Sequence, residues 1–231
     1  TLTSLYKRDI IKNYLHVANN PVLELKKENI HYSSYSKNHR KNLNKELNKS
    51  SRENVDIFFS QDINDLMLFY NILATQYTKS HKMVFQPYGL FENLLNLNLI
   101  KLLVAKIGNE LIGGMIFTPE KDCVHYNWGA RSTYKNINTG LILIDFAIKA
   151  FSKDGYKYFD FGSTSISDYD LFNFKMKWNC VNKKVYKYYT ISKPKQIDLN
   201  KSFSFSRKVY SKIPVKLNKK IMNTLIPWII E

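Results

Sequence analysis

The spacing of apolar residues along the chain predicts helices alternating with strands. Four segments repeat apolar residues every three or four positions, the period of a helix with one buried face: 30–52, 61–79, 87–97 and 140–152. Short apolar or aromatic runs predict strands at 21–25, 55–59, 100–107, 110–118, 123–130, 156–161 and 184–191. Residues 5–17 follow no clean period, so the pattern leaves their structure open.

The order of these elements predicts an α/β (α+β) fold. Gly108-Asn109 and residues 119–122 are hairpin signals, so the three strands between 100 and 130 should form an antiparallel meander. The helix at 140–152 then returns to the strand at 156–161, a crossover that makes two central strands parallel. We therefore expect a mixed, mostly antiparallel sheet flanked by helices.

The composition of the chain indicates an anionic binding partner. The chain has 231 residues, enough for one domain with a sizeable core, and a formal net charge of +16. Such a charge favours nucleic acid, a phosphorylated small molecule or an acidic membrane surface, although scattered lysines also serve solubility alone. No uninterrupted apolar run reaches about twenty residues, so we expect no membrane-spanning helix and a cytoplasmic protein.

The two cysteines, Cys123 and Cys180, are far apart in the sequence and lack neighbours at the spacing of metal ligands. We therefore predict neither a zinc site nor a disulfide framework, and expect both thiols to pack as small apolar groups. The chain also lacks the dinucleotide, P-loop, zinc-protease and nucleophile-elbow motifs.

The densest candidate chemistry lies in residues 156–180, YKYFDFGSTSISDYDLFNFKMKWNC. Gly162 and Ser163 open a turn beyond the carboxyl end of a predicted strand, where open α/β sheets usually bind ligands. Bulky apolar residues then alternate with Lys175 and Lys177, which places positive charge beside an apolar floor. This arrangement suits an anion or a developing oxyanion.

The same stretch resembles the "DFG(R)S…GxxxFKxxWG" signature of FemAB-like proteins and their CelD/BioF-like acyltransferase relatives, which have the GNAT fold. The resemblance extends upstream to NPVLEL at 20–25 and SKNHRKNL at 36–43, and covers residues 20–192. Asn179 stands where the family has glycine, and asparagine can adopt the left-handed conformation at some steric cost.

The resemblance implies three parts of the chain. Residues 20–193 would form the GNAT/FemAB-like acyltransferase domain, and residues 1–19 would be the remnant of a preceding GNAT-like domain. Residues 194–231 form a basic, amphipathic C-terminal tail, which Pro214 and Pro227 should break into short helices. The tail could pack on the domain, or its end at Trp228, Ile229 and Ile230 could dock peripherally on an anionic membrane.

The activity implied by the resemblance is N-acyl transfer, in which an amine attacks the carbonyl of an activated acyl or aminoacyl donor. Lys175 would stabilise the oxyanion, and Phe174 would orient the Lys175 side chain. Asp160 is placed to act as a base or to orient the amine, but capping the turn at Gly162 is an equally good interpretation. We expect Lys175 and residues 162–165 to face one cleft with Trp128 on its wall.

The remaining candidate residues would bind substrates. By resemblance, Arg40, Lys41 and Asn42 lie near phosphates, and Gly162, Ser163, Trp128 and Trp178 line the substrate site. GNAT enzymes cradle the pyrophosphate of acyl-coenzyme A with a Q/R-x-x-G-x-G/A loop before a helix. The corresponding residues here are Lys135, Asn136, Asn138, Thr139 and Gly140, of which only Gly140 fits a glycine position.

The donor therefore stays open between acyl-CoA and aminoacyl-tRNA, with no tightly bound cofactor. The resemblance suggests as acceptor a lipid- or nucleotide-linked amine, such as a peptidoglycan or polysaccharide precursor. An alternative function is a non-catalytic GNAT-fold module that binds RNA or anionic lipid.

Overall fold

The computed structural model describes residues 13–25, 30–83, 85–132, 134, 136–189 and 204–229. Within these ranges the side chains of residues 13–15, 30, 31, 189, 204–207 and 225–229 are outside the description.

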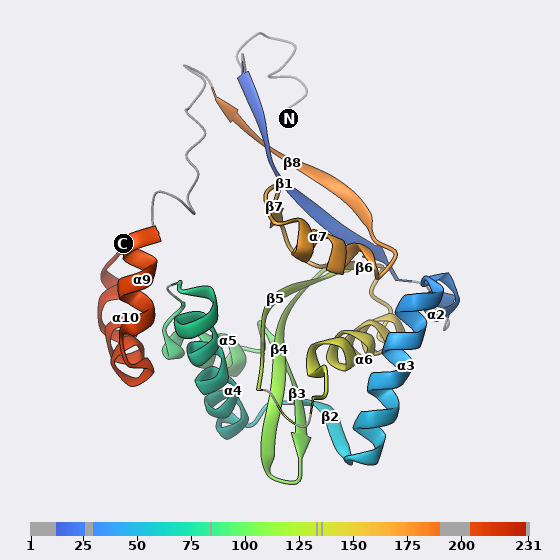
Figure 1. Ribbon diagram of the computed structural model, residues 1–231, viewed down its shortest axis with the longest axis horizontal. Coiled ribbons are helices and arrows are strands. Elements are labelled where there is room, and N and C mark those ends of the chain that lie inside the picture. The colour runs from blue at the N-terminus through green and yellow to red at the C-terminus, as the bar shows by residue number, and fades with distance from the viewer. Residues whose placement is uncertain are drawn as a thin grey trace.

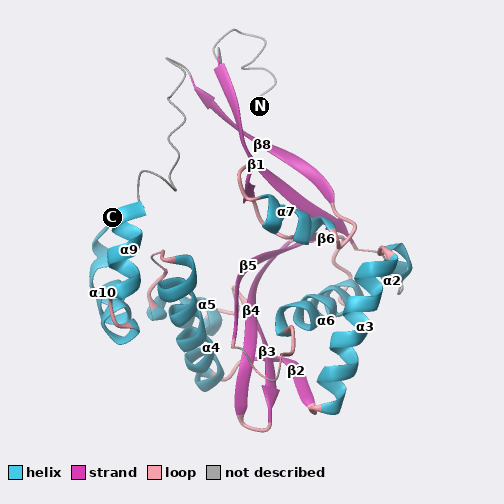
Figure 2. Cartoon of the chain, viewed as in Figure 1, coloured by secondary structure: helices cyan, strands magenta, loops and turns pink. Residues whose placement is uncertain are grey.

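An eight-stranded sheet runs through the described part of the chain (Figures 1 and 2). Its order is β2-β3-β4-β5-β6-β1-β7, and β8 pairs with β1. β5 and β6 are parallel, whereas the other described pairs are antiparallel, which confirms the predicted fold class. The strands are β1 (Asn13–Glu24), β2 (Val55–Ser60), β3 (Lys101–Ile107), β4 (Glu110–Glu120), β5 (Cys123–Arg131), β6 (Tyr158–Asp160), β7 (Thr164–Ser165) and β8 (Val181–Tyr189).

Helices cover both faces of this sheet, with α3 and α6 on one side and α4 and α5 on the other (Figure 1). The helices are α2 (Ile30–Ser34), α3 (Lys37–Arg52), α4 (Ile63–Gln76), the π-helical η1 (Tyr77–His81), α5 (Tyr88–Asn96), α6 (Thr139–Lys153), α7 (Tyr169–Met176), α9 (Ser204–Lys212) and α10 (Val215–Ile229).

Two apolar cores result, one on each face. Leu103 and Ala105 of β3 point into the core under α3 and α6, while Leu102 and Val104 point into the core under α4 and α5. All four side chains are fully buried. Because β3 is covered on both faces, it reads in the sequence as a continuous apolar run without alternation.

β1 and β8 form a two-stranded ribbon that extends beyond the rest of the sheet (Figure 1). Their pairing runs from Val22 with Val181 to Asn13 with Tyr189. The strands predicted at 21–25 and 184–191 overlap β1 and β8, although none of the side chains of residues 181–188 is buried. Residues 13–17 of β1 follow no clean period in the sequence, so the pattern left their structure open. The domain boundary proposed at residue 19 falls inside β1, and the domain assignment stays a prediction.

Two helical segments differ from the prediction. The helix predicted at 30–52 is broken after Ser34, because Ser36 caps α3 by accepting a hydrogen bond from the His39 N–H at 3.2 Å. Residues 169–176, for which the sequence predicted no helix, form the helix α7. Lys175 is the buried residue of α7, so the helix has no apolar stripe for the sequence pattern to reveal.

The C-terminal helices α9 and α10 contact α4 and η1. Met222 is buried in the second core, and Asn218 Nδ2 donates to Thr78 Oγ1 at 3.2 Å. Pro214 separates the two helices as predicted, but α10 continues through Pro227 to Ile229, so the predicted second break is wrong. In the described part of the chain, no helix combines the length and apolar content needed to cross a bilayer.

Candidate active site

The turn that follows β6 is built by Asp160. Its Oδ1 accepts a hydrogen bond from the Gly162 N–H at 2.7 Å, and its Oδ2 accepts one from Asn20 Nδ2 at 3.0 Å. Gly162 has φ +75°, which a glycine adopts without strain. The structure therefore contains the turn-capping contact, one of the two alternatives that the sequence left open for Asp160.

Lys175 approaches the same turn from α7. Asp168 begins this helix by accepting a hydrogen bond from the Leu171 N–H at 3.1 Å. Only 5 % of Lys175 is exposed, and its Nζ donates to the Gly162 carbonyl oxygen at 2.8 Å. Burial lowers the pKa of Lys175 to about 8, while the charges of Asp160 and Asp168 oppose this shift.

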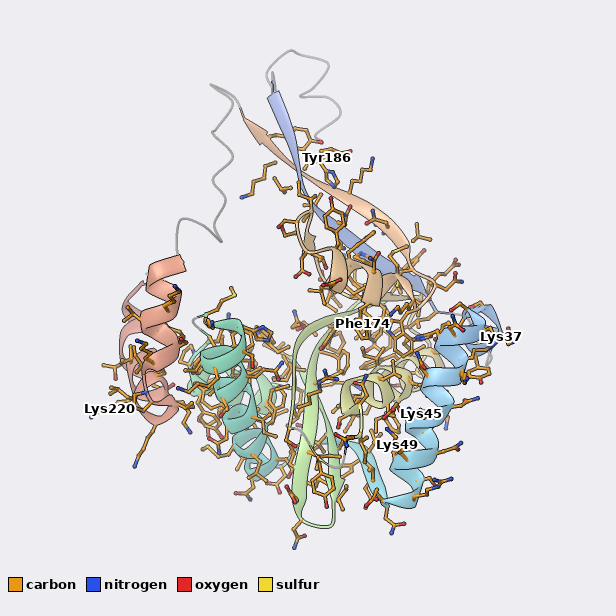
Figure 3. All side chains as sticks on the ribbon, in the orientation of Figure 1. Lys37, Lys45, Lys49, Phe174, Tyr186 and Lys220 are labelled. Carbon is orange, nitrogen blue, oxygen red and sulfur yellow. The ribbon has the colours of Figure 1, made fainter. Side chains whose placement is uncertain are left out.

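This contact brings together three of the predicted site residues: Lys175, Gly162 and Asp160. Ser163 is exposed directly after Gly162. Phe174 is half-buried and packs against the core under α3 and α6, at the end of α7 nearest to that core (Figure 3). The arrangement supplies a buried cation, held in place by a backbone carbonyl, beside a sharp turn at the end of a central strand.

The two predicted tryptophans lie in opposite cores. Trp178 is fully buried in the core under α3 and α6, where its ring packs edge-on against His39 with centroids 4.7 Å apart. Trp128 packs against Phe91 of α5, and its Nε1 donates to Gln86 Oε1 at 3.2 Å. Trp128 therefore belongs to the other core, and the contacts of the described residues do not place it on a wall shared with Lys175.

The predicted phosphate-binding residues lie on α3. Arg40 Nη1 donates to the Ser33 carbonyl oxygen at 2.9 Å, so this guanidinium ties α3 to α2. Lys41 and Asn42 are exposed. Lys41 lines a surface groove of about 470 Å³, together with Asn44, Lys45, Asn48, Lys49 and Arg52. We call this basic face of α3 the α3 groove; Figure 3 labels Lys45 and Lys49 in it.

The predicted donor loop contacts the α3 groove. Lys49 Nζ donates to the Asn136 carbonyl oxygen at 3.1 Å, and Asn138 Oδ1 accepts a hydrogen bond from Arg131. Thr139 is fully buried, and its methyl group would lie 2.8 Å from a Cβ placed on Gly113. Gly140 is partly buried, and Lys135 lies outside the described residues. Thr139 thus packs against the sheet.

The sequence interpretation missed Glu46, the single acidic residue of α3. Its Oε2 accepts a hydrogen bond from the Asn138 N–H at 2.8 Å, and its Oε1 lies 3.0 Å from Lys49 Nζ. Burial alone would raise the pKa of Glu46, but the hydrogen bonds from Asn138 and Lys49 lower it overall. A carboxylate of the chain therefore accepts a hydrogen bond from the N–H of the residue before α6, where by resemblance GNAT enzymes hold the pyrophosphate of acyl-coenzyme A. The sequence did contain a sign of this role, because Glu46 is the one acidic residue on a helix rich in basic residues.

The acetyltransferase (GNAT) domain model matches residues 37–175, which is more than half of the chain. The chain belongs to the GNAT acetyltransferase family. The matched residues begin at α3 and end at Lys175, so both the α3 groove and the β6 turn lie within this GNAT domain.

Solved structures share the fold at low sequence identity. FemX superimposes with a TM-score of 0.65 at 11 % identity, covering 89 % of this chain and 70 % of that one. L-PGS from Bacillus licheniformis gives a TM-score of 0.61 at 14 % identity, covering 91 % and 70 % of the two chains. The search of curated proteins found no match. The family match confirms the GNAT-type resemblance and indicates an acyltransferase, and the two solved structures share its fold.

Proposed function

We propose that this GNAT domain transfers an activated acyl or aminoacyl group to a primary amine, with Lys175 stabilising the negative charge that develops on the reacting carbonyl. The observation that supports this most directly is the buried Lys175 ammonium at the turn after β6. A buried ammonium needs a strong acceptor, and an oxyanion is a stronger one than the neutral Gly162 carbonyl. The attraction therefore increases as the transition state forms.

The reaction needs no bound cofactor. The amine nitrogen attacks the acyl carbon, the carbon–nitrogen bond forms, and the carbonyl oxygen takes the negative charge beside Lys175. The tetrahedral intermediate then collapses and breaks the bond to the donor's sulfur or ribose oxygen, and the proton lost by the amine nitrogen passes through solvent to that leaving atom. Asp160 holds the Gly162 turn through its hydrogen bonds and thereby fixes the carbonyl that positions Lys175.

We propose an aminoacyl-tRNA as the donor, with acyl-CoA as the alternative. Two observations support the choice. The α3 groove presents Lys41, Lys45, Lys49 and Arg52 on one helix face, which suits a chain of phosphates better than a single pyrophosphate. The Glu46 carboxylate at Asn138 also opposes a pyrophosphate at the N-terminus of α6, because like charges repel.

For the acceptor we propose a lipid- or nucleotide-linked amine of the cell envelope. One structural neighbour is titled the C-terminal domain of a putative lysylphosphatidylglycerol synthetase from Agrobacterium fabrum, at 13 % identity and a TM-score of 0.58, covering 80 % of this chain and 63 % of that chain. The name of this neighbour refers to a phospholipid, which supports including envelope lipids among the acceptors that are tested. With this acceptor we also propose that the protein is cytoplasmic and acts at the inner face of the membrane.

The test compares two lysine variants of the same chain. Lys175→Met removes the buried ammonium, and Lys177→Met makes the same change at an exposed neighbouring position. Each protein is given labelled acetyl-CoA or RNA charged with labelled amino acids, together with extracted envelope lipids and nucleotide-linked precursors. Label in an amide product is then measured by mass spectrometry.

We expect transfer by the wild type, and a loss of about 100-fold or more in Lys175→Met, the size typical of removing one oxyanion donor. Lys177→Met should remain close to wild type. A wild-type rate in Lys175→Met would refute the oxyanion role. If neither donor supports transfer, while RNA or anionic lipid binds equally to wild type and Lys175→Met, the non-catalytic alternative is correct; the α3 groove is the feature that favours it.

A further inference from the structure

A second cluster of chemically active side chains lies where β5 and β6 run parallel. Cys123 and His125 are two residues apart on β5, so both point to the same face of the sheet. His125 is the register partner of Asp160 on β6. One ligand atom from each of Cys123, His125 and Asp160 lies within 4.8 Å of the others. The sequence could not show this cluster, because Asp160 joins it only through the parallel pairing.

We propose that Cys123, His125 and Asp160 form a binding site for a zinc-type divalent cation. A thiolate, an imidazole and a carboxylate are the three ligand types that zinc takes in proteins, and three protein ligands plus one water complete its tetrahedral shell. The thiolate and the carboxylate together balance the two positive charges of the ion. The bound site is therefore electrically neutral, which suits a position that is only partly exposed.

The surroundings of His125 and Asp160 support this assignment. His125 Nδ1 lies 3.5 Å from Asp160 Oδ2 and faces the cluster, whereas His125 Nε2 lies 3.7 Å from Glu120 Oε2 on the other side. Metal-bound histidines usually donate their second ring N–H to a carboxylate, which fixes the ring and its tautomer. Glu120 is placed for that role. Asn20 and Gly162 hold the Asp160 carboxylate by hydrogen bonds.

The site adjoins the turn that Lys175 contacts, because Asp160 takes part in both. Lys175 contacts the carbonyl of Gly162, whereas Cys123 and His125 lie on β5. Burial raises the pKa of the Cys123 thiol, with Asp160 adding to the shift, so without a cation the thiol is a poor nucleophile. On binding, the thiol gives its proton to solvent and the sulfur bonds to the metal. The site adds a cation-binding property to the proposed acyl transfer.

Cobalt(II) titration of the untagged, chelator-treated chain tests the proposal, because a thiolate bound to cobalt produces an intense charge-transfer absorption. We expect one cobalt ion per chain, displaceable by zinc, and loss of this absorption in Cys123→Ser. Zinc affinity, measured by competition with a chromophoric chelator, should fall strongly in Cys123→Ser and His125→Gln. Glu120→Gln should weaken it by about 10- to 100-fold, the usual effect of losing an outer partner.

Cys180→Ala and His81→Gln are the matched controls, because Cys180 lies in the core under α3 and α6 and His81 lies on η1. Both should keep the cobalt spectrum and the zinc affinity of the wild type. The proposal fails if the wild type binds no stoichiometric cobalt, if Cys123→Ser keeps the absorption, or if Cys180→Ala loses it. Circular dichroism on each variant confirms that any loss occurs in a folded chain.

Discussion

At the scale of single residues, the contact between Lys175 and Gly162 could be anticipated, because a short linker joins β6 to α7 and leaves little choice of geometry. Trp128 could not be assigned to a face. β5 has an irregularity in its pairing with β4, where Ile116 pairs with Trp128 and the next residue pairs with Tyr126. A bulge of this kind shifts which side chains point to which face, and the sequence pattern carries no sign of it.

The buried Lys175 predicts a pH-dependent stability. Its pKa is about 8 in the folded chain, below its ordinary value of 10.5, so between these two pH values the unfolded chain binds more protons. The free energy of unfolding contributed by this group therefore rises with pH across that window, by up to about 1.4 kcal/mol per pH unit. Below pH 8 both states are protonated and the cost of burying the ammonium is fully present.

Urea unfolding of wild type and Lys175→Met at several pH values between 7 and 10.5 measures this contribution. The variant should be the more stable protein near pH 7, and its advantage should shrink as pH rises. Lys177→Met, exposed, should follow wild type throughout. A difference between wild type and Lys175→Met that stays constant with pH would contradict the lowered pKa.

Gly114 of β4 predicts a steric limit within the sheet. A Cβ at this position would lie 2.7 Å from Phe69 Cδ2 and 3.0 Å from the Leu103 carbonyl oxygen, and the backbone oxygen cannot move aside. Gly114→Ala should therefore lower the free energy of unfolding by about 1–3 kcal/mol in urea melts. Gly89→Ala, on α5 with nothing within 4 Å of the added methyl, should leave stability unchanged or slightly higher. Equal effects of the two substitutions would rule out this packing argument.

At the scale of elements, the sequence located most helices and strands that bury apolar residues, and it missed α7 and the first half of β1. α4, α6 and β3 were predicted because they contribute many buried apolar residues. α7 contributes Lys175 as its buried residue, so it leaves no periodic pattern. β1 was predicted only from residue 21 onward, whereas the strand predicted at 184–191 overlaps β8. The candidate site is carried by one of these weakly patterned elements, which is why its details needed the structure.

The N-terminal cap of α7 predicts that the stability of this helix determines how firmly Lys175 is held. Asp168→Ala removes the side-chain acceptor for the Leu171 N–H and should cost about 1 kcal/mol in stability. Because α7 is short, its first turn should fray and loosen the hold on Lys175, which lowers the transfer rate. Asp168→Ser keeps a capping oxygen and should restore both quantities. Hydrogen exchange of the α7 amides should rise in the alanine variant alone; no change there would disprove the capping role.

At the scale of the whole molecule, the C-terminal helices α9 and α10 pack on the domain through one of their faces. Asn218 and Met222 of α10 face the domain, whereas Lys208, Lys212, Lys216 and Lys220 are exposed, and Figure 3 shows Lys220 on the outer side of α10. The face that packs on the domain is therefore different from the face that carries the exposed lysines. The side chains of Trp228 and Ile229 lie outside the described ones, as does Ile230 altogether, so their role in docking stays a prediction.

Changing those four exposed lysines to glutamine tests peripheral docking without exposing the second core. We expect the variant to lose most of its binding to anionic liposomes in flotation, because each lysine near such a surface contributes about 1 kcal/mol before screening. Binding by the wild type should weaken with added salt. Four substitutions to glutamine at Lys37, Lys121, Lys153 and Lys184, away from α9 and α10, serve as the control of equal charge. Equal flotation of the two variants would exclude the C-terminal helices as the docking surface.

The Glu46 carboxylate is an anion of the chain itself that accepts a hydrogen bond from the N–H of Asn138, the residue before α6. Because the carboxylate belongs to the same chain, its local concentration is fixed by the fold and does not fall on dilution. A free anion must displace it before it can use that N–H group, which raises the threshold for small phosphates. The aminoacyl-tRNA donor that we propose would bind the α3 groove and would not depend on that N–H group, so Glu46 should favour it over a small phosphate.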